Sequence, residues 1–120
     1  MKRLKTGQNW RVGWDDEAGV FKGLLGADDW SVELTEAEFD EFLRLLSSLS
    51  DAIESMRTEL MDEEAIAIDQ ESELLWMQVD GFPDAYSISF MLQTGRRADG
   101  HWKAEPAAAL RQAIQTIKLF

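Results

Sequence analysis

The sequence predicts an α+β domain in which two amphipathic helices pack on antiparallel β-sheet. Apolar residues recur at steps of three and four over residues 35–60, which is the helical period. Apolar and polar residues alternate over residues 86–93, which is the strand period. A Glu-Pro pair at 105–106 opens a second helical pattern. The expected order is β-β-β-(β)-α-β-β-β-β-α in one domain, 1–120, with halves of approximately 1–60 and 61–120.

Three strands are predicted before the first helix. Trp10, Val12 and Trp14 alternate with other residues and mark the first strand, residues 20–25 the second, and residues 30–34 the third. Glycines at 23 and 26 weaken the second strand. Turn residues at 15–19 and 27–29 separate the strands, and such short turns predict antiparallel pairing.

The first helix has a clear start signal. Thr35 is followed three residues later by Glu38, the pattern of a capping box, in which each side chain bonds the backbone N–H of the other residue. One apolar stripe then follows: Phe39, Phe42, Leu46, Leu49, Ile53, Met56 and Leu60. A straight helix of this length is about as long as the domain is wide, so we expect it to bend or to project at one end.

Four strands and a helix are predicted in the second half. Residues 65–68 are apolar throughout, consistent with a strand that is covered on both faces. Turns at 69–73 and 81–84 flank a strand at 74–79, the alternating strand follows at 86–93, and a short strand is expected at 101–104. The last helix buries Leu110, Ile114 and Ile117.

The composition excludes several classes of function. The formal net charge is −11, and residues 58–95 contain no Lys or Arg. Binding to nucleic acid or to an acidic membrane surface draws on clustered cations, so this charge argues against both. The absence of cysteine excludes disulfides and thiolate metal sites. No apolar run approaches the roughly 20 residues that span a bilayer, and we expect a cytoplasmic protein.

Several motifs together resemble a small cyanobacterial protein family of unknown function, over nearly the whole chain. They are Trp10-Arg11-Val12-Gly13-Trp14-Asp15, Phe21-x-Gly23-Leu24, Asp29-Trp30-x-Val32-Glu33-Leu34-Thr35-Glu36-x-Glu38 and Arg97-x-x-Gly100-x-Trp102. That family is grouped by fold with the Whirly-type single-stranded-DNA-binding transcriptional regulators. The resemblance implies a tandem pair of β-β-β-β-α units in one chain and a cytoplasmic setting. It implies no mechanism, and the Lys-rich strand and loop with which Whirly-type proteins hold DNA are missing here.

One dense cationic cluster lies outside the N-terminus, and it is the candidate site for an anion or a nucleic acid. It comprises Arg96, Arg97, His101, Trp102 and Lys103. Arginines and a lysine can hold phosphates, while an aromatic ring can stack on a base. The structural alternative is a solvated turn, with Trp102 in the core and Arg97 paired with a nearby acid.

Neither a metal site, a cofactor site nor a catalytic residue is predicted. A single histidine, His101, cannot form the usual zinc triad without cysteines. The carboxylates at 62–64 and at Asp69, Glu71 and Glu73 lack the glycine and distal glutamate of a calcium loop. Trp10, Trp14 and Trp30 are interpreted as core residues, with an exposed stacking row as the alternative.

Three functions remain open from the sequence. The first is a non-enzymatic protein-interaction or regulatory module with a protein partner or a homodimeric state. The second is single-stranded nucleic-acid binding through the hairpin at 96–103, although the negative charge makes nucleic acid a doubtful partner. The third is a small-anion-binding protein or enzyme that uses the same hairpin and nearby carboxylates.

Overall fold

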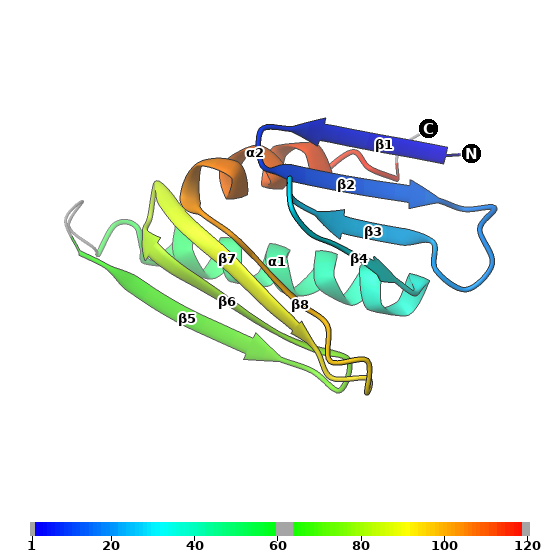
Figure 1. The fold of residues 1–120 in the computed structure, drawn as a ribbon. Helices are drawn as coiled ribbons and strands as arrows, with labels where there is room; N and C mark the ends of the chain where they lie inside the picture. The colour runs from blue at the N-terminus through cyan, green and yellow to red at the C-terminus, as the bar shows by residue number, and fades with distance from the viewer. Residues whose placement is uncertain (1, 60–63, 119–120) are drawn as a thin grey trace.

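The computed structural model describes residues 2–59 and 64–118 (Figure 1). These residues form eight strands and two helices, which confirms the predicted α+β class. The elements are β1 (Lys2–Gly7), β2 (Trp10–Asp15), β3 (Gly23–Gly26), β4 (Ser31–Leu34), α1 (Glu36–Met56), β5 (Ile66–Glu71), β6 (Leu75–Phe82), β7 (Ala85–Leu92), β8 (Asp99–Trp102) and α2 (Ala104–Ile114). Within the described residues, no helix combines the length and apolarity needed to cross a bilayer.

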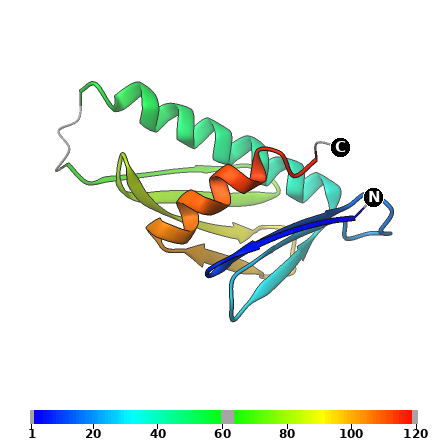
Figure 2. The same ribbon diagram turned by 90° about the horizontal axis from the view of Figure 1, so that it is seen from above.

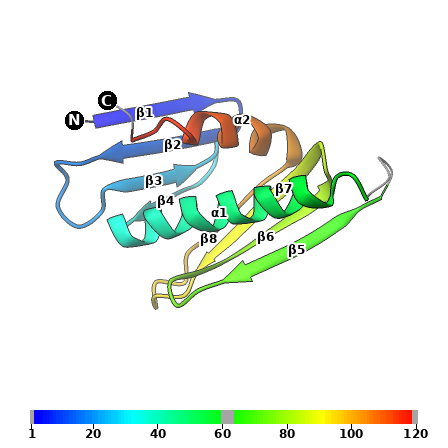
Figure 3. The same cartoon turned by 180° about the vertical axis from the view of Figure 1, so that it is seen from behind.

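The strands form two four-stranded antiparallel sheets, each in simple chain order. The first sheet is β1-β2-β3-β4 and the second is β5-β6-β7-β8. Both helices bridge the sheets: α1 contacts β5 and β6 as well as β3 and β4, while α2 contacts β7 and β8 as well as β1 and β2. Figure 3 shows α1 running along both sheets, and Figure 2 shows α2 between α1 and the first sheet. The two β-β-β-β-α halves therefore share one core.

The predicted capping box starts α1. The Thr35 hydroxyl accepts from the Glu38 N–H at 3.2 Å, and Glu38 Oε1 accepts from the Thr35 N–H at 2.9 Å. The stripe from Phe39 to Ile53 is buried against the sheets. The described helix has 21 residues, about 32 Å of rise, and the molecule extends 46 × 29 × 27 Å. The helix therefore fits within the long axis, and the chain itself covers its apolar stripe; Leu60 lies outside the described residues.

An aromatic cluster fills the junction between the two sheets. Trp102 stacks on Phe90 with ring centroids 5.5 Å apart, and Phe42 meets both rings edge-on. Trp30, in the turn just before β4, packs on Trp102 with ring centroids 5.1 Å apart. The Trp102 Nε1–H donates to the Gly26 carbonyl at 2.9 Å, which links β8 to β3. Apolar burial and this hydrogen bond fix one sheet against the other.

Strand β1 is an element that the sequence pattern missed. Its inward-facing side chains are Arg3 and Lys5, whereas Leu4 faces outward and is 54% exposed. The usual alternation is thus inverted. Arg3 Nη1 donates to the Thr116 carbonyl at 2.7 Å and Lys5 Nζ to the Ala113 carbonyl at 2.9 Å. These cations satisfy carbonyls at the C-terminal end of α2, where the helix dipole favours positive charge.

The predicted start of the second strand and the predicted end of β5 were also wrong. The second strand starts at Gly23 instead of residue 20, and Val20 is 68% exposed. Strand β5 is covered on one face only, because Ala67, Asp69 and Glu71 on its other face are exposed. It also continues to Glu71 through the predicted turn, since pairing with β6 extends to Glu71 opposite Trp76. Backbone pairing thus decided these ends, and side-chain pattern did not.

Strand β8 was predicted at 101–104, two residues too late. It runs from Asp99 to Trp102 and pairs with β7. Lys103 is then the N-cap of α2, although its side chain makes no capping hydrogen bond. Leu110, Ile114 and Ile117 are buried as predicted.

Candidate functional site

The structure disperses the predicted cationic cluster. Arg96 is an ion-pair partner of Glu38, donates through Nη1 to the Glu33 carbonyl at 2.7 Å, and lies over the Phe21 ring with Cζ 4.9 Å from the centroid. Trp102 is 1% exposed and belongs to the core, as the structural alternative proposed. Arg96 is therefore engaged by neighbouring residues at the surface, and Trp102 is engaged in the core.

The remaining members of the cluster point to different surroundings. His101 Nδ1 lies 2.8 Å from Ser89 Oγ on the outer face of the second sheet. Arg97 is exposed in the loop before β8 with a positive φ of 55°. Lys103 is exposed at the start of α2. Of the two arginines, Arg96 and not Arg97 forms the ion pair that the sequence suggested for Arg97.

Glu38 is the buried charge beneath this hairpin. It is 2% exposed and accepts from the Thr35 N–H, from Thr94 Oγ1 at 2.6 Å and from Arg96. Burial raises the pKa of Glu38, but the hydrogen bonds from Thr94 and Thr35 and the charge of Arg96 outweigh it and hold the pKa below its ordinary value. The carboxylate is fully engaged, so this network ties α1 to the loop before β8 and offers no open site.

The outer face of the second sheet carries acidic side chains, and its strands contain no lysine or arginine. Strands β5 to β8 contain no Lys or Arg and carry four carboxylates, at Asp69, Glu71, Asp80 and Asp99. Strand register sets two rows across this face: Glu71–Trp76–Met91–Asp99 and Asp69–Gln78–Ser89–His101. We call the face defined by these two rows and Asp80 the acidic face.

Aromatic and apolar groups lie among the carboxylates of the acidic face. Trp76 is half-buried and donates through Nε1 to Asp69 at 3.0 Å, and Met91 is 45% exposed. Beside them is a hollow of about 440 Å³ lined by Trp30, Trp76, Ser89, Phe90, Met91, Asp99, Gly100 and His101. Gly100 is required here, because a Cβ at that position would lie 2.3 Å from the Trp30 ring.

The carboxylates of this face keep most of their capacity to accept hydrogen bonds. Asp69 accepts from Trp76 and Glu71 from Gln93, whereas Asp80 and Asp99 have no side-chain partner in the described part of the chain. The described residues contain no group of three or more His, Cys, Asp or Glu side chains able to hold a metal ion. The sequence analysis did not predict this face, because it assigned residues 69–73 to a turn. The absence of Lys and Arg from residues 58–95 was the one feature of the sequence that indicated an acidic surface here.

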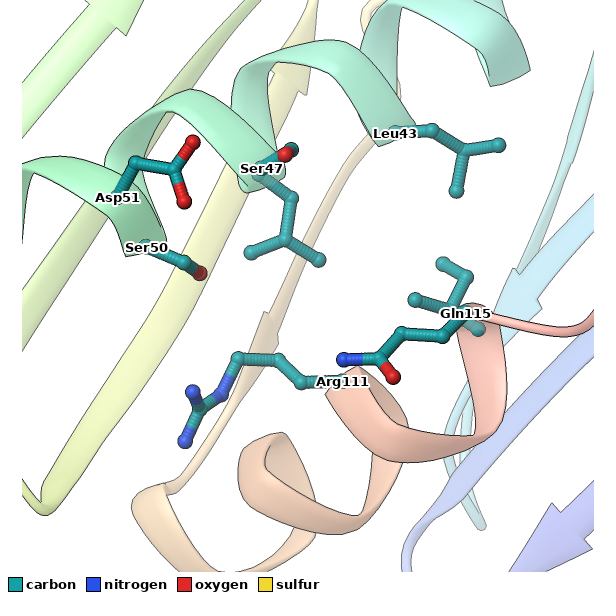
Figure 4. A pocket seen from close by; sticks show the side chains of 8 residues that line it. Leu43, Ser47, Ser50, Asp51, Arg111 and Gln115 are labelled. Carbon is teal, nitrogen blue, oxygen red and sulfur yellow. The ribbon is translucent and has the colours of Figure 1, made fainter. Parts of the chain in front are cut away.

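A second concave site lies between the two helices (Figure 4). It is a cleft of about 380 Å³ lined by Leu43, Leu46, Ser47, Ser50, Asp51, Arg111, Ile114 and Gln115. Figure 4 shows Asp51 on the α1 wall and Arg111 on the α2 wall. We call this space the interhelical cleft.

Tyr86 positions the guanidinium of Arg111 in this cleft. Arg111 Cζ lies 4.2 Å from the centroid of the Tyr86 ring, and Nη1 donates to the Tyr86 hydroxyl at 2.5 Å. The same hydroxyl lies 3.2 Å from Ser50 Oγ. Arg111 Nε is buried without a hydrogen-bond partner, and no carboxylate among the described residues pairs with the guanidinium. Neither Arg111 nor Asp51 was singled out from the sequence.

Comparison with known proteins gives the fold independent support. The structure is similar to the crystal structure of a protein of unknown function from the DUF155 family of Prochlorococcus sp. NATL2A, with a TM-score of 0.90, 21% identity and 98% of each chain covered. At this identity the likeness shows the fold alone. Neither that description nor the family below mentions Whirly-type regulators, so the comparisons do not support that part of the resemblance.

No curated protein matches the chain. The family DUF1818, described as a domain of unknown function, matches residues 5–117. This span includes β2 to β8 and both helices. The chain therefore belongs to the DUF1818 family of domains of unknown function.

Proposed function

We propose that the protein is a non-enzymatic interaction module whose acidic face binds a Lys- or Arg-rich extended segment of a partner protein. The observation that carries the proposal is the charge of the second sheet, whose strands hold four carboxylates and no cation. Complementary charge speeds the encounter of two proteins and selects the correct partner. An acidic sheet face therefore fits a basic partner.

The arrangement of the rows suggests how such a segment would be held. Asp69 and Asp99 lie in neighbouring rows on opposite edge strands, with Trp76 and Met91 between them. A Lys or Arg side chain could pair with either carboxylate and lie over the Trp76 ring, where a cation–π contact adds to the ion pair. Met91 offers an adaptable apolar contact. The hollow beside Trp30 would take one bulky side chain of the segment.

A peptide titration followed by NMR tests this proposal. The isotope-labelled protein is titrated with a short peptide of alternating lysine and leucine and, separately, with a matched glutamate–leucine peptide. We expect the lysine peptide to shift resonances of the acidic face, Trp76 Nε1–H included, and to lose affinity as salt rises. The glutamate peptide should leave the face unchanged.

Matched double variants separate this face from overall charge. Asp69→Asn with Asp99→Asn should weaken lysine-peptide binding about tenfold or more, the effect of losing two partly desolvated charge pairs. Asp29→Asn with Asp51→Asn removes the same charge elsewhere and should leave binding intact. Equal weakening by both pairs would show unspecific attraction and refute the site. Sedimentation tests whether the partner is a second copy of this chain. If the mass doubles as concentration rises, and Asp69→Asn with Asp99→Asn returns it to that of one protomer, the acidic face binds a second copy and not a foreign partner.

Single-stranded nucleic-acid binding, implied by the Whirly-type resemblance, is the second candidate, and exposed Arg97 and Lys103 favour it. Its support is weaker because Trp102 is buried and Arg96 is paired with Glu38. A labelled oligonucleotide at low salt tests it: binding that Arg97→Gln with Lys103→Gln abolishes would favour this candidate. For either candidate we propose a cytoplasmic setting, which the lack of cysteine supports.

A further inference from the structure

We infer that the interhelical cleft binds a small zwitterion of the α-amino-acid class with an apolar side chain. The inference concerns a different face from the acidic face and does not depend on the proposed function. It starts from two opposite charges, Arg111 and Asp51, that line one cleft from different helices without forming an ion pair. The cleft volume of about 380 Å³ is in the range of small-molecule sites.

The guanidinium of Arg111 has an unused edge. Its Nη1 is committed to the Tyr86 hydroxyl, whereas Nε is buried without an acceptor. Nε is enclosed by protein atoms, so a ligand carboxylate would meet the Nη2 side of the planar guanidinium fork. The N–H groups on that side donate charge-assisted hydrogen bonds, which carboxylate oxygens accept well. The Tyr86 ring and hydroxyl hold this fork in place before any ligand arrives.

The opposite wall supplies a negative charge and hydroxyl groups. Asp51 is exposed on α1, and its carboxylate forms no hydrogen bond or ion pair within the described residues. An ammonium group of the ligand would neutralise it. Ser47, from the same helix, offers a further hydroxyl. A simple anion would leave Asp51 facing a like charge, so a ligand with both charges fits the cleft better.

The apolar floor of the cleft determines which side chain the ligand should carry. Leu43, Leu46 and Ile114 contribute apolar side chains between the charged groups. Leu46 and Ile114 are buried, and Leu43 is half-buried. A branched aliphatic side chain would cover this surface and gain from leaving water. L-leucine is thus a suitable probe.

Calorimetric titration with three related compounds tests the inference. L-leucine carries both charges, 4-methylpentanoate lacks the ammonium group, and 3-methylbutylamine lacks the carboxylate. We expect L-leucine to bind at least about tenfold more tightly than either analogue, the effect of losing one charge-assisted hydrogen bond. Equal binding of L-leucine and 4-methylpentanoate, or no binding of L-leucine at millimolar concentration, would overturn the inference.

Variants of Arg111 and Asp51 test which charged group of the ligand each residue binds. Arg111→Gln should abolish L-leucine binding, and Arg111→Lys should restore only part of it, because lysine lacks the planar fork. Asp51→Asn lies on the surface and should fold normally while losing the preference for L-leucine over 4-methylpentanoate. If Asp51→Asn keeps that preference, the zwitterion assignment is wrong. Asp69→Asn with Asp99→Asn should leave L-leucine binding unchanged, which separates this site from the acidic face.

Discussion

The two sheets share one topology but use their charges differently. Strands β1 to β4 carry four cations, Lys2, Arg3, Lys5 and Arg11, beside two carboxylates. Strands β5 to β8 carry four carboxylates and no cation. In the first sheet Arg3 and Lys5 bond the end of α2, and Arg11 Nε donates to the Ala27 carbonyl at 3.1 Å. Three of the four cations of the first sheet therefore donate hydrogen bonds to backbone carbonyls of the fold.

Charges of the second sheet are largely left to solvent. Asp80 and Asp99 have no side-chain partner in the described residues, and Asp69 is engaged by the Trp76 indole alone. A charge that satisfies a helix end is constrained by the fold, whereas a charge facing water can be selected for a partner. The comparison thus separates a structural sheet from a sheet that is free to bind.

The largest expected effect comes from breaking the junction between the sheets. Trp102→Ala removes the ring that packs on Phe90 and Trp30 and the hydrogen bond to the Gly26 carbonyl. We expect the free energy of unfolding to fall by about 3–5 kcal/mol, the usual cost of a large core truncation. Denaturant unfolding measures it. A loss below about 1 kcal/mol would mean that the sheets do not depend on this ring.

The next largest effect is expected for Glu38, the buried charge that ties α1 to the loop before β8. Glu38→Gln should lower the free energy of unfolding at neutral pH by about 2–3 kcal/mol, since charged hydrogen bonds to Thr94 and Arg96 are lost. Because the pKa of Glu38 is lowered on folding, its contribution is present above the ordinary pKa of 4.5 and disappears as the pH falls through the folded value.

Unfolding curves of both proteins over a series of pH values check this sign. The wild type should lose stability on acidification below about pH 4.5 more steeply than Glu38→Gln, so the two should converge. A difference that stays constant with pH would show that the carboxylate charge is not what stabilises the junction.

A smaller loss should follow removal of a structural cation from the first sheet. Lys5→Met leaves the carbonyl of Ala113 without its lysine donor, and we expect a loss of about 0.5–1 kcal/mol, the usual value for a cation at a helix C-terminus. Lys2→Met is the matched control, because the Lys2 side chain is exposed and forms no hydrogen bond or ion pair with the described residues. Thermal unfolding of both variants should rank them in that order; the reverse order would contradict a structural role for Lys5.

The smallest effect is expected in the second sheet. Asp80→Asn with Asp99→Asn should change the free energy of unfolding by no more than about 0.5 kcal/mol, since neither carboxylate bonds another side chain in the described residues. The same unfolding measurement tests it. A loss as large as that of Lys5→Met would erase the distinction between the two sheets.

Prediction from the sequence succeeded where side chains repeat a clear pattern. The capping box of Thr35 and Glu38 and the alternation of β7 are local signals, and both are present in the structure. Strand β1 was missed because its inward residues are cations whose partners lie more than 100 residues away. The end of β5 was missed because pairing with β6, not apolar pattern, extends it.

The candidate sites likewise combine features that a local sequence pattern predicts with features that distant contacts decide. The hairpin at 96–103 was visible as a run of cations, yet whether each one faces water depended on distant partners such as Glu38. Arg111 and Asp51 are far apart in the chain and line one cleft only because α1 and α2 both lie across the same two sheets. No local pattern contains such a pair.

By itself, the sequence determined the α+β class, the start of α1, the strand β7 with its clear alternation of apolar and polar residues, and the negative charge of the chain. These depend on residues within a few positions of one another, or on composition alone. The tertiary structure decided which charges are structural, which face of the second sheet stays open and where a cleft forms. Those properties depend on contacts between elements that the chain brings together only when apolar surface from both halves is buried in one core.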